Sequence, residues 1–252
     1  MKKILLVGSG NVATHLAKNI DNKNYCINQV FSRNKENAKK LIEFLGCNWT
    51  NNPKKILKSD ITIISVNDDS IKNVIKFLPN IPTVHTSGCT GIDILKKFND
   101  YGVLYPLQTF KKNVEINIKE VPFLIETNSK KFENDLFQLA NNISEIVRVT
   151  DSKTRKKIHL AAVFACNFTN HMLVLAKKIC DESNNDFSLL LPLIKKTFNQ
   201  INENPIKLQT GPAFRKDIGV IEEHLKIIED KNLKKIYNFL SQNIIQTKNE
   251  DI

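Results

Sequence analysis

The first half of the chain alternates short apolar runs with segments whose apolar residues recur at helical spacing. The strongest run is ITIISV at 61–66, which is continuous, β-branched and closed by the polar Asn67, Asp68 and Asp69. Such runs predict strands buried on both faces, and their alternation with helices predicts parallel β-α-β units. We expect strands at 3–7, 26–32, 61–66, 83–86, 121–125 and 143–149, and helices at 11–19, 35–45, 70–78 and 131–141.

After about residue 150 the strand pattern ends and only helical periodicity remains. We expect a long helix at 152–180, followed by helices at 189–202, 218–230 and 233–245. The predicted fold class is therefore α/β. We expect a Rossmann-type, mainly parallel sheet at 1–150 and an all-helical domain at 151–252. A chain of 252 residues is long enough to form both.

The charge balance is basic, at +11 from 37 Lys and Arg against 26 Asp and Glu. Lysine supplies nearly all of it, because the arginines are only Arg33, Arg148, Arg155 and Arg215. Nucleic-acid binders gather basic residues and aromatics on one face, whereas these lysines are scattered, so we expect no nucleic-acid partner. Lys, Asn and Ile share A/T-rich codons, and mutational drift explains the balance as well as function does.

Five cysteines, at positions 26, 47, 89, 166 and 180, form no C-x-x-C pair. An odd number without such spacing predicts a reduced, cytoplasmic protein without a disulfide framework or a metal site. The first apolar run stops at Gly8 and is too short for a secretory leader. No unbroken apolar run approaches the roughly 18 residues of a membrane span, so we expect no membrane partner.

The segment VGSGNVA at 7–13 has the form G-x-G-x-x-A and joins the first predicted strand to the first helix. The first Gly permits a tight turn, the second lets the backbone approach a pyrophosphate, and the small Ala lets helix and strand pack closely. The helix N-terminus offers free N–H groups to the phosphates. The alternative is a plain strand-to-helix turn. The candidate cofactor contacts are Gly8, Ser9, Gly10, Asn11 and Val12.

The end of the second strand indicates which dinucleotide is bound. NAD-binding folds place an Asp or Glu there for the ribose 2′-hydroxyl, but this chain has Ser32 and Arg33. A hydroxyl and a planar guanidinium suit a 2′-phosphate, so NADP is favoured over NAD. The alternative is a solvated surface arginine. Val66, Asn67 and Asp68 should lie near the nicotinamide ribose, and capping of the next helix is compatible with that role.

Polar residues also end the strand at 83–86, with the sequence HTSG at 85–88. Ligands of open α/β sheets bind outside the carboxyl ends of strands, so these groups, Ser87 among them, should face the reacting end of the cofactor. The alternative is a turn with a strand-end histidine. YPLQTF at 105–110 is expected to form a polar-tipped loop in the same crevice. Nothing in the sequence pairs Cys89 with a base.

The predicted long helix carries His159, Asn167, Asn170 and His171 among apolar residues. His159 and Asn170 are eleven residues apart, about three helical turns, and would share a face. Polar groups on such a stripe are costly to bury without a partner, which makes them candidates for substrate contact. The alternative is that one or two of them are satisfied core or interface groups.

A second marked segment, TGPAFRKD at 210–217, interrupts the helical pattern with Gly-Pro. Asp217 is expected to cap the helix that follows. Arg215 is a candidate for holding an anionic substrate, and the alternative is that it ties the loop down.

Together these segments resemble, nearly end to end, a bacterial Rossmann-like family of NADP oxidoreductases whose helical C-terminal half is a domain of unknown function. The chain is more distantly similar to pyrroline-5-carboxylate reductase, ketopantoate reductase and the β-hydroxyacid dehydrogenases. The resemblance implies a reductase or dehydrogenase with its active site between two domains, often a dimer through the helices. It rests on GSGNVATHLA at 8–17, FSR at 31–33, SVNDDSI at 65–71, HTSG at 85–88, YPLQTF at 105–110, HLAAVFACNFTNH at 159–171 and TGPAFRKD at 210–217.

Two departures from these groups matter for the mechanism. The β-hydroxyacid dehydrogenases place a Lys four residues before an Asn on their long helix, whereas Val163 stands four residues before Asn167. His159, one turn earlier, is the available substitute. The Gly-Pro-Ala of the pyrroline reductases opens their long helix, but here it follows that helix, at 211–213. No substrate therefore carries over from either group.

The sequence thus predicts a cytoplasmic NADP-dependent oxidoreductase that transfers a hydride between nicotinamide and a small carbonyl, imine or hydroxy-acid metabolite. His159 would be the general acid or base, because histidine titrates near neutral pH. Asn167 would orient the substrate, and Arg215 would bind a carboxylate. We expect a homodimer through the helical domain. The alternative, prompted by the missing lysine, is a non-catalytic NADP-binding sensor or partner-docking module.

Overall fold

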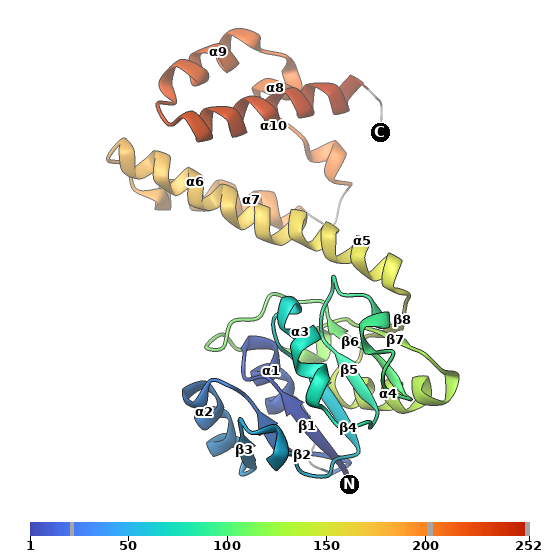
Figure 1. Ribbon diagram of the computed structural model, residues 1–252. Coiled ribbons are helices and arrows are strands. Elements are labelled where there is room, and N and C mark those ends of the chain that lie inside the picture. Colours follow the sequence, from blue (N-terminus) through green and yellow to red (C-terminus); the bar gives the residue numbers. More distant parts are fainter. Residues whose placement is uncertain (21–22, 201–203, 250–252) are drawn as a thin grey trace. The chain divides into compact units, whose positions relative to one another are not determined.

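The structure, a computed structural model, describes residues 1–20, 23–200 and 204–249 (Figure 1). The chain forms two compact units, Met1–Asn167 and Phe168–Ile252, which we call the sheet unit and the helical unit. The predicted domain boundary lies earlier, near residue 150, where the last strand gives way to helix.

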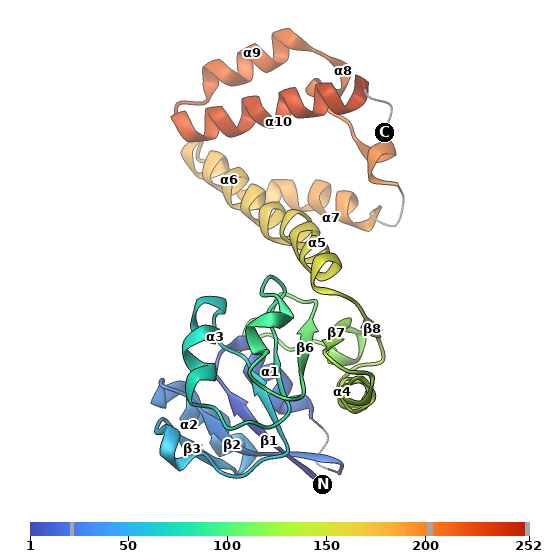
Figure 2. The same ribbon diagram turned by 45° about the vertical axis from the view of Figure 1, so that its right-hand side comes forward.

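The sheet unit contains strands β1 (Lys2–Val7), β2 (Tyr25–Phe31), β3 (Asn48–Thr50), β4 (Ile61–Ile64), β5 (Thr83–His85), β6 (Tyr101–Pro106), β7 (Phe123–Thr127) and β8 (Val147–Val149). Within the described residues they form one sheet in the order β3-β2-β1-β4-β5-β6-β7-β8 (Figures 1 and 2). Neighbouring strands run parallel except β6 and β7, which are antiparallel. The chain order reverses at β1, and such a switch point opens a crevice at the carboxyl ends of the strands.

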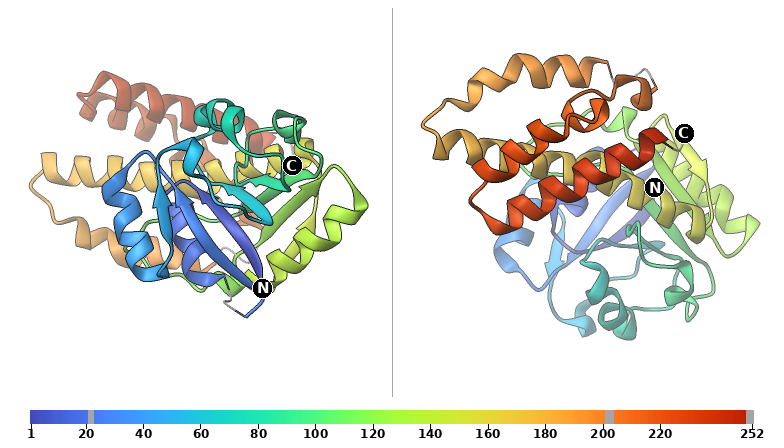
Figure 3. Two further views of the ribbon diagram at one scale, coloured as in Figure 1. Left: turned by 60° about the horizontal axis from the view of Figure 1, so that its bottom comes forward. Right: turned by 90° about the horizontal axis from the view of Figure 1, so that it is seen from above.

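Helices flank both faces of the sheet (Figure 3). Helices α1 (Asn11–Asn19), α2 (Lys35–Leu45) and α4 (Lys130–Ile143) contribute to one core, and α3 (Asp68–Val74) contributes to the other. Strand β1 shows why both cores form, since Ile4 and Leu6 enter the first core and Leu5 and Val7 enter the second. Successive side chains of a strand point to opposite faces, so a continuous apolar run is buried on both.

The predicted fold class is confirmed, and α1 and α2 begin and end at the predicted residues. Strands β3 and β6 were not predicted. Tyr105 was expected in a loop, which is wrong, because Tyr101–Pro106 is strand β6. Pro106 lacks an N–H, but as the last residue of β6 it interrupts the hydrogen-bond ladder only at the end of the strand. Short 3-10 helices that were not predicted lie at Pro53–Lys55, Ile92–Leu95, Ile118–Glu120 and Pro205–Leu208. Two others, Ile75–Phe77 and Phe187–Leu190, fall within or overlap the helices predicted at 70–78 and 189–202.

The predicted helix at 152–180 is present as three consecutive segments: α5 (Ser152–Ala162), a π-helix (Val163–Phe168) and α6 (Thr169–Glu182). The π-helix was not predicted, and Asn167 lies within it. A π-helix has a wider turn than an α-helix, and such segments are frequent at functional sites. The expectation that His159 and Asn170 share a face assumed an unbroken α-helix, so that argument no longer holds.

By length and composition alone, one helical stretch among the described residues could cross a membrane. It is Ser152–Glu182, whose most apolar window has a mean hydropathy of 1.4 and no buried residue. The sequence prediction considered only unbroken apolar runs, whereas Asn167, Asn170 and His171 interrupt this one.

The helical unit contains α6, α7 (Leu191–Asn199), α8 (Pro212–Arg215), α9 (Ile218–Ile227) and α10 (Lys231–Asn249). Helix α10 packs against α8 and α9 (Figures 1 and 2). The helix predicted at 189–202 corresponds to α7, and residues 201 and 202 lie outside the described residues. Among the described side chains of this unit, those that are buried are Ala213, Ile221, Leu233 and Ser241.

Two local details of the helical unit differ from the prediction. Helix α8 was not expected, because Gly211-Pro212 was interpreted as a break, yet proline is favoured at the first position of a helix. Asp217 stands at the N-cap position of α9, but its side chain makes no capping hydrogen bond, so the predicted cap is wrong. Its carboxylate pairs with Arg215 instead.

Candidate functional site

The glycine loop between β1 and α1 has the geometry that a dinucleotide requires. Gly8 has a φ of +119°, and a Cβ there would lie 2.1 Å from the carbonyl oxygen of Ser65, so only glycine fits. Gly10 is the N-cap of α1, where no side chain caps the helix and a Cβ would meet nothing within 4 Å. The N-terminus of α1 therefore presents N–H groups to open space, which fits the pyrophosphate of a dinucleotide.

A cavity of about 790 Å³ opens beside this loop. Its volume lies in the range of small-molecule and cofactor sites. It lies between the glycine loop, the end of β2 and the start of α3, and none of its lining residues is acidic. Seven of the predicted cofactor contacts line it: Gly8, Ser9, Gly10, Ser32, Arg33, Val66 and Asn67.

The other four predicted contacts lie elsewhere. Asn11 donates a hydrogen bond from its amide to the carbonyl of Phe110, at 2.9 Å. Val12 packs against the apolar core. Asp68 and Ser87 are bonded to each other, since the Ser87 hydroxyl donates to the Asp68 carboxylate at 2.6 Å. These residues hold loops around the cavity and do not line it.

The Ser32 hydroxyl and the Arg33 guanidinium differ in how accessible they are to a ligand. The hydroxyl of Ser32 is buried, lies 2.8 Å from that of Ser9, and accepts the backbone N–H of Asn34. Arg33 is exposed on the cavity lining and forms no ion pair with an acidic residue in the described part of the chain. Arg33 is therefore the group that can meet a 2′-phosphate.

A continuous set of hydrogen bonds leads from the cavity toward the end of β5. Asn67 lines the cavity, and its neighbour Asp68 accepts the Ser87 hydroxyl. The same hydroxyl accepts the backbone N–H groups of Cys89 and Thr90, at 3.1 and 2.8 Å. The loop after β5 is thereby held at the rim of the cavity.

His159 of α5 lies against this loop. Its Nδ1 is 2.9 Å from the hydroxyl of Tyr105, which is the fifth residue of β6. Gly88 packs so closely behind both rings that a Cβ would lie 2.7 Å from Nδ1 of His159 and 2.8 Å from Cζ of Tyr105. The predicted acid/base residue therefore stands beside a second ionisable group, which the sequence analysis had placed in a loop.

His85 does not face a ligand, contrary to the expectation for the HTSG segment. It is 0% exposed, and its Nδ1 accepts the backbone N–H of Ser87 at 3.2 Å. Burial, and next the positive charge of Arg155, lowers the pKa of His85 to about 4. A neutral histidine that holds a turn is the alternative that the sequence left open.

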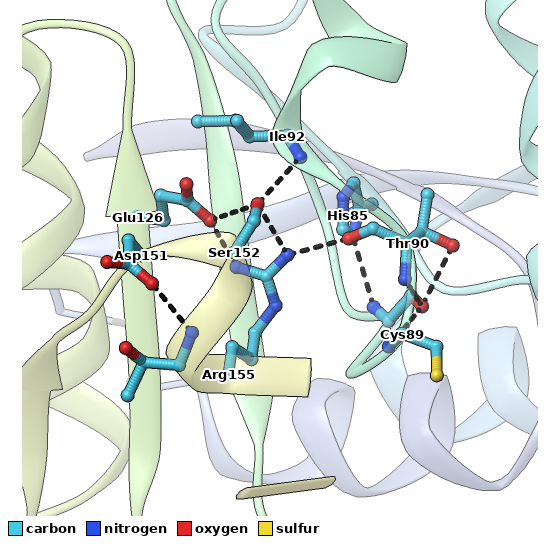
Figure 4. A network of polar contacts seen from close by, with 10 residues as sticks. His85, Cys89, Thr90, Ile92, Glu126, Asp151, Ser152 and Arg155 are labelled. Atoms are coloured by element: carbon cyan, nitrogen blue, oxygen red, sulfur yellow. Dashed lines mark hydrogen bonds and ion pairs between the residues drawn. The ribbon is translucent and has the colours of Figure 1, made fainter. Parts of the chain in front are cut away.

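Arg155 is the residue that the sequence analysis missed. It is 0% exposed, and its guanidinium pairs with the carboxylate of Glu126 on β7 and donates to the Thr90 carbonyl at 2.6 Å (Figure 4). Ser152 joins them, since its hydroxyl donates to Glu126 and accepts the backbone N–H of Ile92. Little in the sequence indicates that Arg155 is buried, because it lies in the first turn of a predicted helix among the lysines at 153, 156 and 157.

This cluster determines where His159 lies. Asp151 caps α5 by accepting the N–H of Thr154 at 2.6 Å, a bond that lowers the pKa of the Asp151 carboxyl. From Arg155 to His159 an α-helix rises about 6 Å. Glu126 pairs with Val103 across the β6–β7 ladder, and from Val103 to Tyr105 a strand rises about 6.6 Å. The rise along α5 from Arg155 to His159 and the rise along β6 from Val103 to Tyr105 are nearly equal. The ion pair of Arg155 with Glu126 therefore places His159 next to Tyr105.

The remaining predicted site residues are placed as follows. Asn167 is exposed, in the π-helix at the end of the sheet unit. Arg215 is exposed in the helical unit, where its Nε and NH2 groups both lie 2.9 Å from the Asp217 carboxylate. Asn170 and His171 are exposed on α6. Over the described residues, no group of three or more His, Cys, Asp or Glu side chains could hold a metal ion.

The sheet order and the glycine cradle define a Rossmann-class dinucleotide-binding oxidoreductase. Residues 3–86 match the family model described as NADP oxidoreductase, coenzyme F420-dependent, and residues 121–244 match DUF2520, a domain of unknown function. A solved NADP oxidoreductase candidate from Bacteroides fragilis is 36% identical over 97% of this chain and 98% of that chain, with a TM-score of 0.89. The chain belongs to this family of NADP oxidoreductases with a C-terminal DUF2520 domain.

Two more distant solved structures share the fold. A protein from Thermotoga maritima is 23% identical over 98% of this chain and 99% of that chain, with a TM-score of 0.71. Pyrroline-5-carboxylate reductase from Streptococcus pyogenes is 12% identical over 97% and 98% of the two chains, with a TM-score of 0.60. Among curated proteins no match was found.

Arg155→Met should destabilise the sheet unit by about 3–5 kcal/mol, because it leaves Glu126 largely buried without its cation. Arg148→Met, at an exposed position of β8, is the matched control and should change the stability by less than about 0.5 kcal/mol. Urea unfolding followed by circular dichroism measures both variants. Equal stability of the two would show that the buried pair does not anchor α5.

Proposed function

We propose that this NADP oxidoreductase reduces a small metabolite at a carbonyl or imine carbon, or oxidises a hydroxy acid in the reverse direction. The His159–Tyr105 pair carries the proposal, because it adjoins the loop that is bonded to the rim of the cofactor cavity. Hydride transfer to C=O or C=N needs such a proton donor. The imine reductases and pyrroline-5-carboxylate reductase that share the fold support the imine class.

Each chain residue would have one task in this reaction. Bound NADPH would supply the hydride, and the glycine loop and α1 would hold its pyrophosphate. His159 would supply or accept the proton. Asn167 would orient the substrate, and Arg215 would bind a carboxylate of the substrate in place of Asp217.

Arg33 supports NADP as the cofactor in preference to NAD. It is the exposed cation on a cavity lining that holds no acidic residue, and an acidic residue is what would accept a ribose 2′-hydroxyl. A guanidinium can bind a 2′-phosphate with two hydrogen bonds.

Arg33→Asp should reverse the cofactor preference from NADPH to NADH, because it replaces a phosphate ligand with a ribose ligand. Isothermal titration calorimetry with each cofactor gives the two affinities. Lys39→Asp, an equal charge change on the exposed side of α2 and outside the cavity lining, should leave the preference unchanged. Equal affinities of the wild-type protein for NADPH and NADH would exclude the 2′-phosphate role of Arg33.

His159→Gln should lower turnover by about 10²–10⁴-fold and leave NADPH affinity unchanged, because it removes the proton donor and no cavity-lining group. The assay follows NADPH absorbance with a panel of small carbonyl, imine and hydroxy-acid compounds. His224→Gln is the matched control, since His224 also bonds a tyrosine hydroxyl, at 2.8 Å, but on the exposed helices α9 and α10. Tight NADPH binding without turnover of any compound would favour a sensor or docking module.

We also propose that the protein is a cytoplasmic homodimer formed through the helical unit, without membrane or nucleic-acid partners. Helices α6 and α7 have no buried side chain, and Val174 and Leu193 are exposed there, as is Leu189 in the 3-10 helix between them. A second copy suits this surface better than a bilayer, because Asn167, Asn170 and His171 would be costly in hydrocarbon.

The five free cysteines fit the reducing environment of the cytoplasm, and cell fractionation tests that location.

Leu193→Glu should convert the dimer to a monomer, because it adds a charge to the apolar surface of α7 that the second copy would cover. Sedimentation velocity measures the mass. Val114→Glu, the same change at an exposed apolar residue in a loop of the sheet unit, should leave the dimer intact. A monomeric wild-type protein would rule out the dimer.

A further inference from the structure

Tyr105 and His159 form a pair whose geometry is fixed by contacts within the sheet unit. The hydroxyl of Tyr105 lies 2.9 Å from Nδ1 of His159, and the two rings meet edge to face with centroids 5.7 Å apart. Gly88 closes the space behind both rings. Because Tyr105 occupies Nδ1, Nε2 is the ring nitrogen that is left for a substrate.

This hydrogen bond can run in either direction, because a phenol both donates and accepts and the tautomer of His159 sets the roles. Burial raises the pKa of Tyr105 to about 12, so the hydroxyl keeps its proton at neutral pH. A phenol has one O–H to donate, and its hydrogen-bond partner within the described residues is Nδ1 of His159. A neutral imidazole that accepts at Nδ1 carries its own proton on Nε2.

Charged and titratable groups surround the pair from four parts of the fold. Cys89 and Asp68 raise the pKa of Tyr105 further, from the loop after β5 and from α3, whereas Arg155 on α5 lowers it. Arg155 therefore stabilises a phenolate at this position. His85 on β5 is held neutral by its burial and has its Nδ1 bonded to a backbone N–H. The phenol is thus the group that can pass a proton to His159.

We propose that Tyr105 acts through His159 as the positioning residue of the proton transfer, holding the proton of the ring on Nε2 and replacing it as it leaves. The proposal rests on the proposed function, in which His159 is the acid, and adds that the Tyr105 hydroxyl supplies the proton to His159. It differs from a lone histidine acid, which would have to donate as an imidazolium.

The proton and electron pairs balance in this step. As the substrate carbon takes up the hydride, the π pair of its C=O or C=N bond takes the proton from Nε2 and the Nε2–H bond breaks. The phenol proton moves to Nδ1, so the ring stays neutral and Tyr105 becomes a phenolate. Water then returns a proton to the phenolate. The substrate has gained one hydride and one proton.

The first test reads the position of the proton without cofactor, substrate or turnover. Long-range ¹H–¹⁵N correlation spectra of protein with ¹⁵N-labelled histidine distinguish protonated from unprotonated ring nitrogens. His159→Gln assigns the signal. The wild-type protein at mildly alkaline pH should show His159 protonated on Nε2, and Tyr105→Phe should give a mixture of the two tautomers. A proton on Nδ1 in the wild-type protein would overturn the proposal, whatever the activity.

The second test is the pH profile of the reduction at saturating NADPH. The wild-type rate should be flat from about pH 7 to 9, because tyrosine keeps its proton there. In Tyr105→Phe only an imidazolium can donate, so the rate should fall as the pH rises over the same range. Tyr237→Phe, which removes the hydroxyl bonded to His224, is the matched control and should keep the flat profile.

The two tests separate this proposal from the function on which it rests. A wild-type enzyme that turns over while Tyr105→Phe keeps the wild-type tautomer and pH profile would overturn the role of Tyr105 and leave the reductase assignment intact. Absence of turnover in the wild-type protein would count against that assignment, and the tautomer would still decide whether Tyr105 holds His159. Thermal unfolding of Tyr105→Phe checks that the lost hydroxyl has not unfolded the sheet unit.

Discussion

The buried pairing of Arg155 with Glu126 is the interaction on which the reactive end of the sheet unit depends. An arginine without solvent contact is costly unless its charge is paired, and here Glu126 pairs with NH1 while the Thr90 carbonyl accepts from NH2. Nε of Arg155 is buried and has no hydrogen-bond partner among the described residues. Glu126 and Thr90 come from β7 and from the loop after β5. One side chain therefore positions α5 relative to the sheet, and through the matching rise of helix and strand it positions His159 relative to Tyr105.

Local patterns in the sequence were sufficient for the fold but not for this cluster. Helices α1 and α2 were predicted to the residue, because their apolar spacing and the glycine loop are local signals. Tyr105 was assigned to a polar-tipped loop, whereas its place in a strand depends on pairing with Leu124 of β7, about twenty residues further on. The bonds of Arg155 to Glu126 and Thr90 span 29 and 65 residues, and no periodicity records such pairings.

The structure explains why one of the few arginines in this chain, Arg155, is an arginine and not a lysine. A planar guanidinium can bind a carboxylate and a carbonyl at once, whereas an ammonium is a single point of charge on a flexible stem. At Arg155 both acceptors are present and water is excluded, so lysine could not replace it. Lysine serves elsewhere, on solvated surfaces, where the net charge of +11 is spread thinly.

The groups for NADP chemistry in the sheet unit are held by contacts within the protein itself. Gly8 and Gly10 fix an open helix N-terminus, Ser87 ties the loop after β5 to Asp68, and that loop backs His159. Preorganised groups of this kind need little reorganisation when charge develops in the reaction. Relatives with the same fold carry the names of different reductases, and fold alone does not set the substrate.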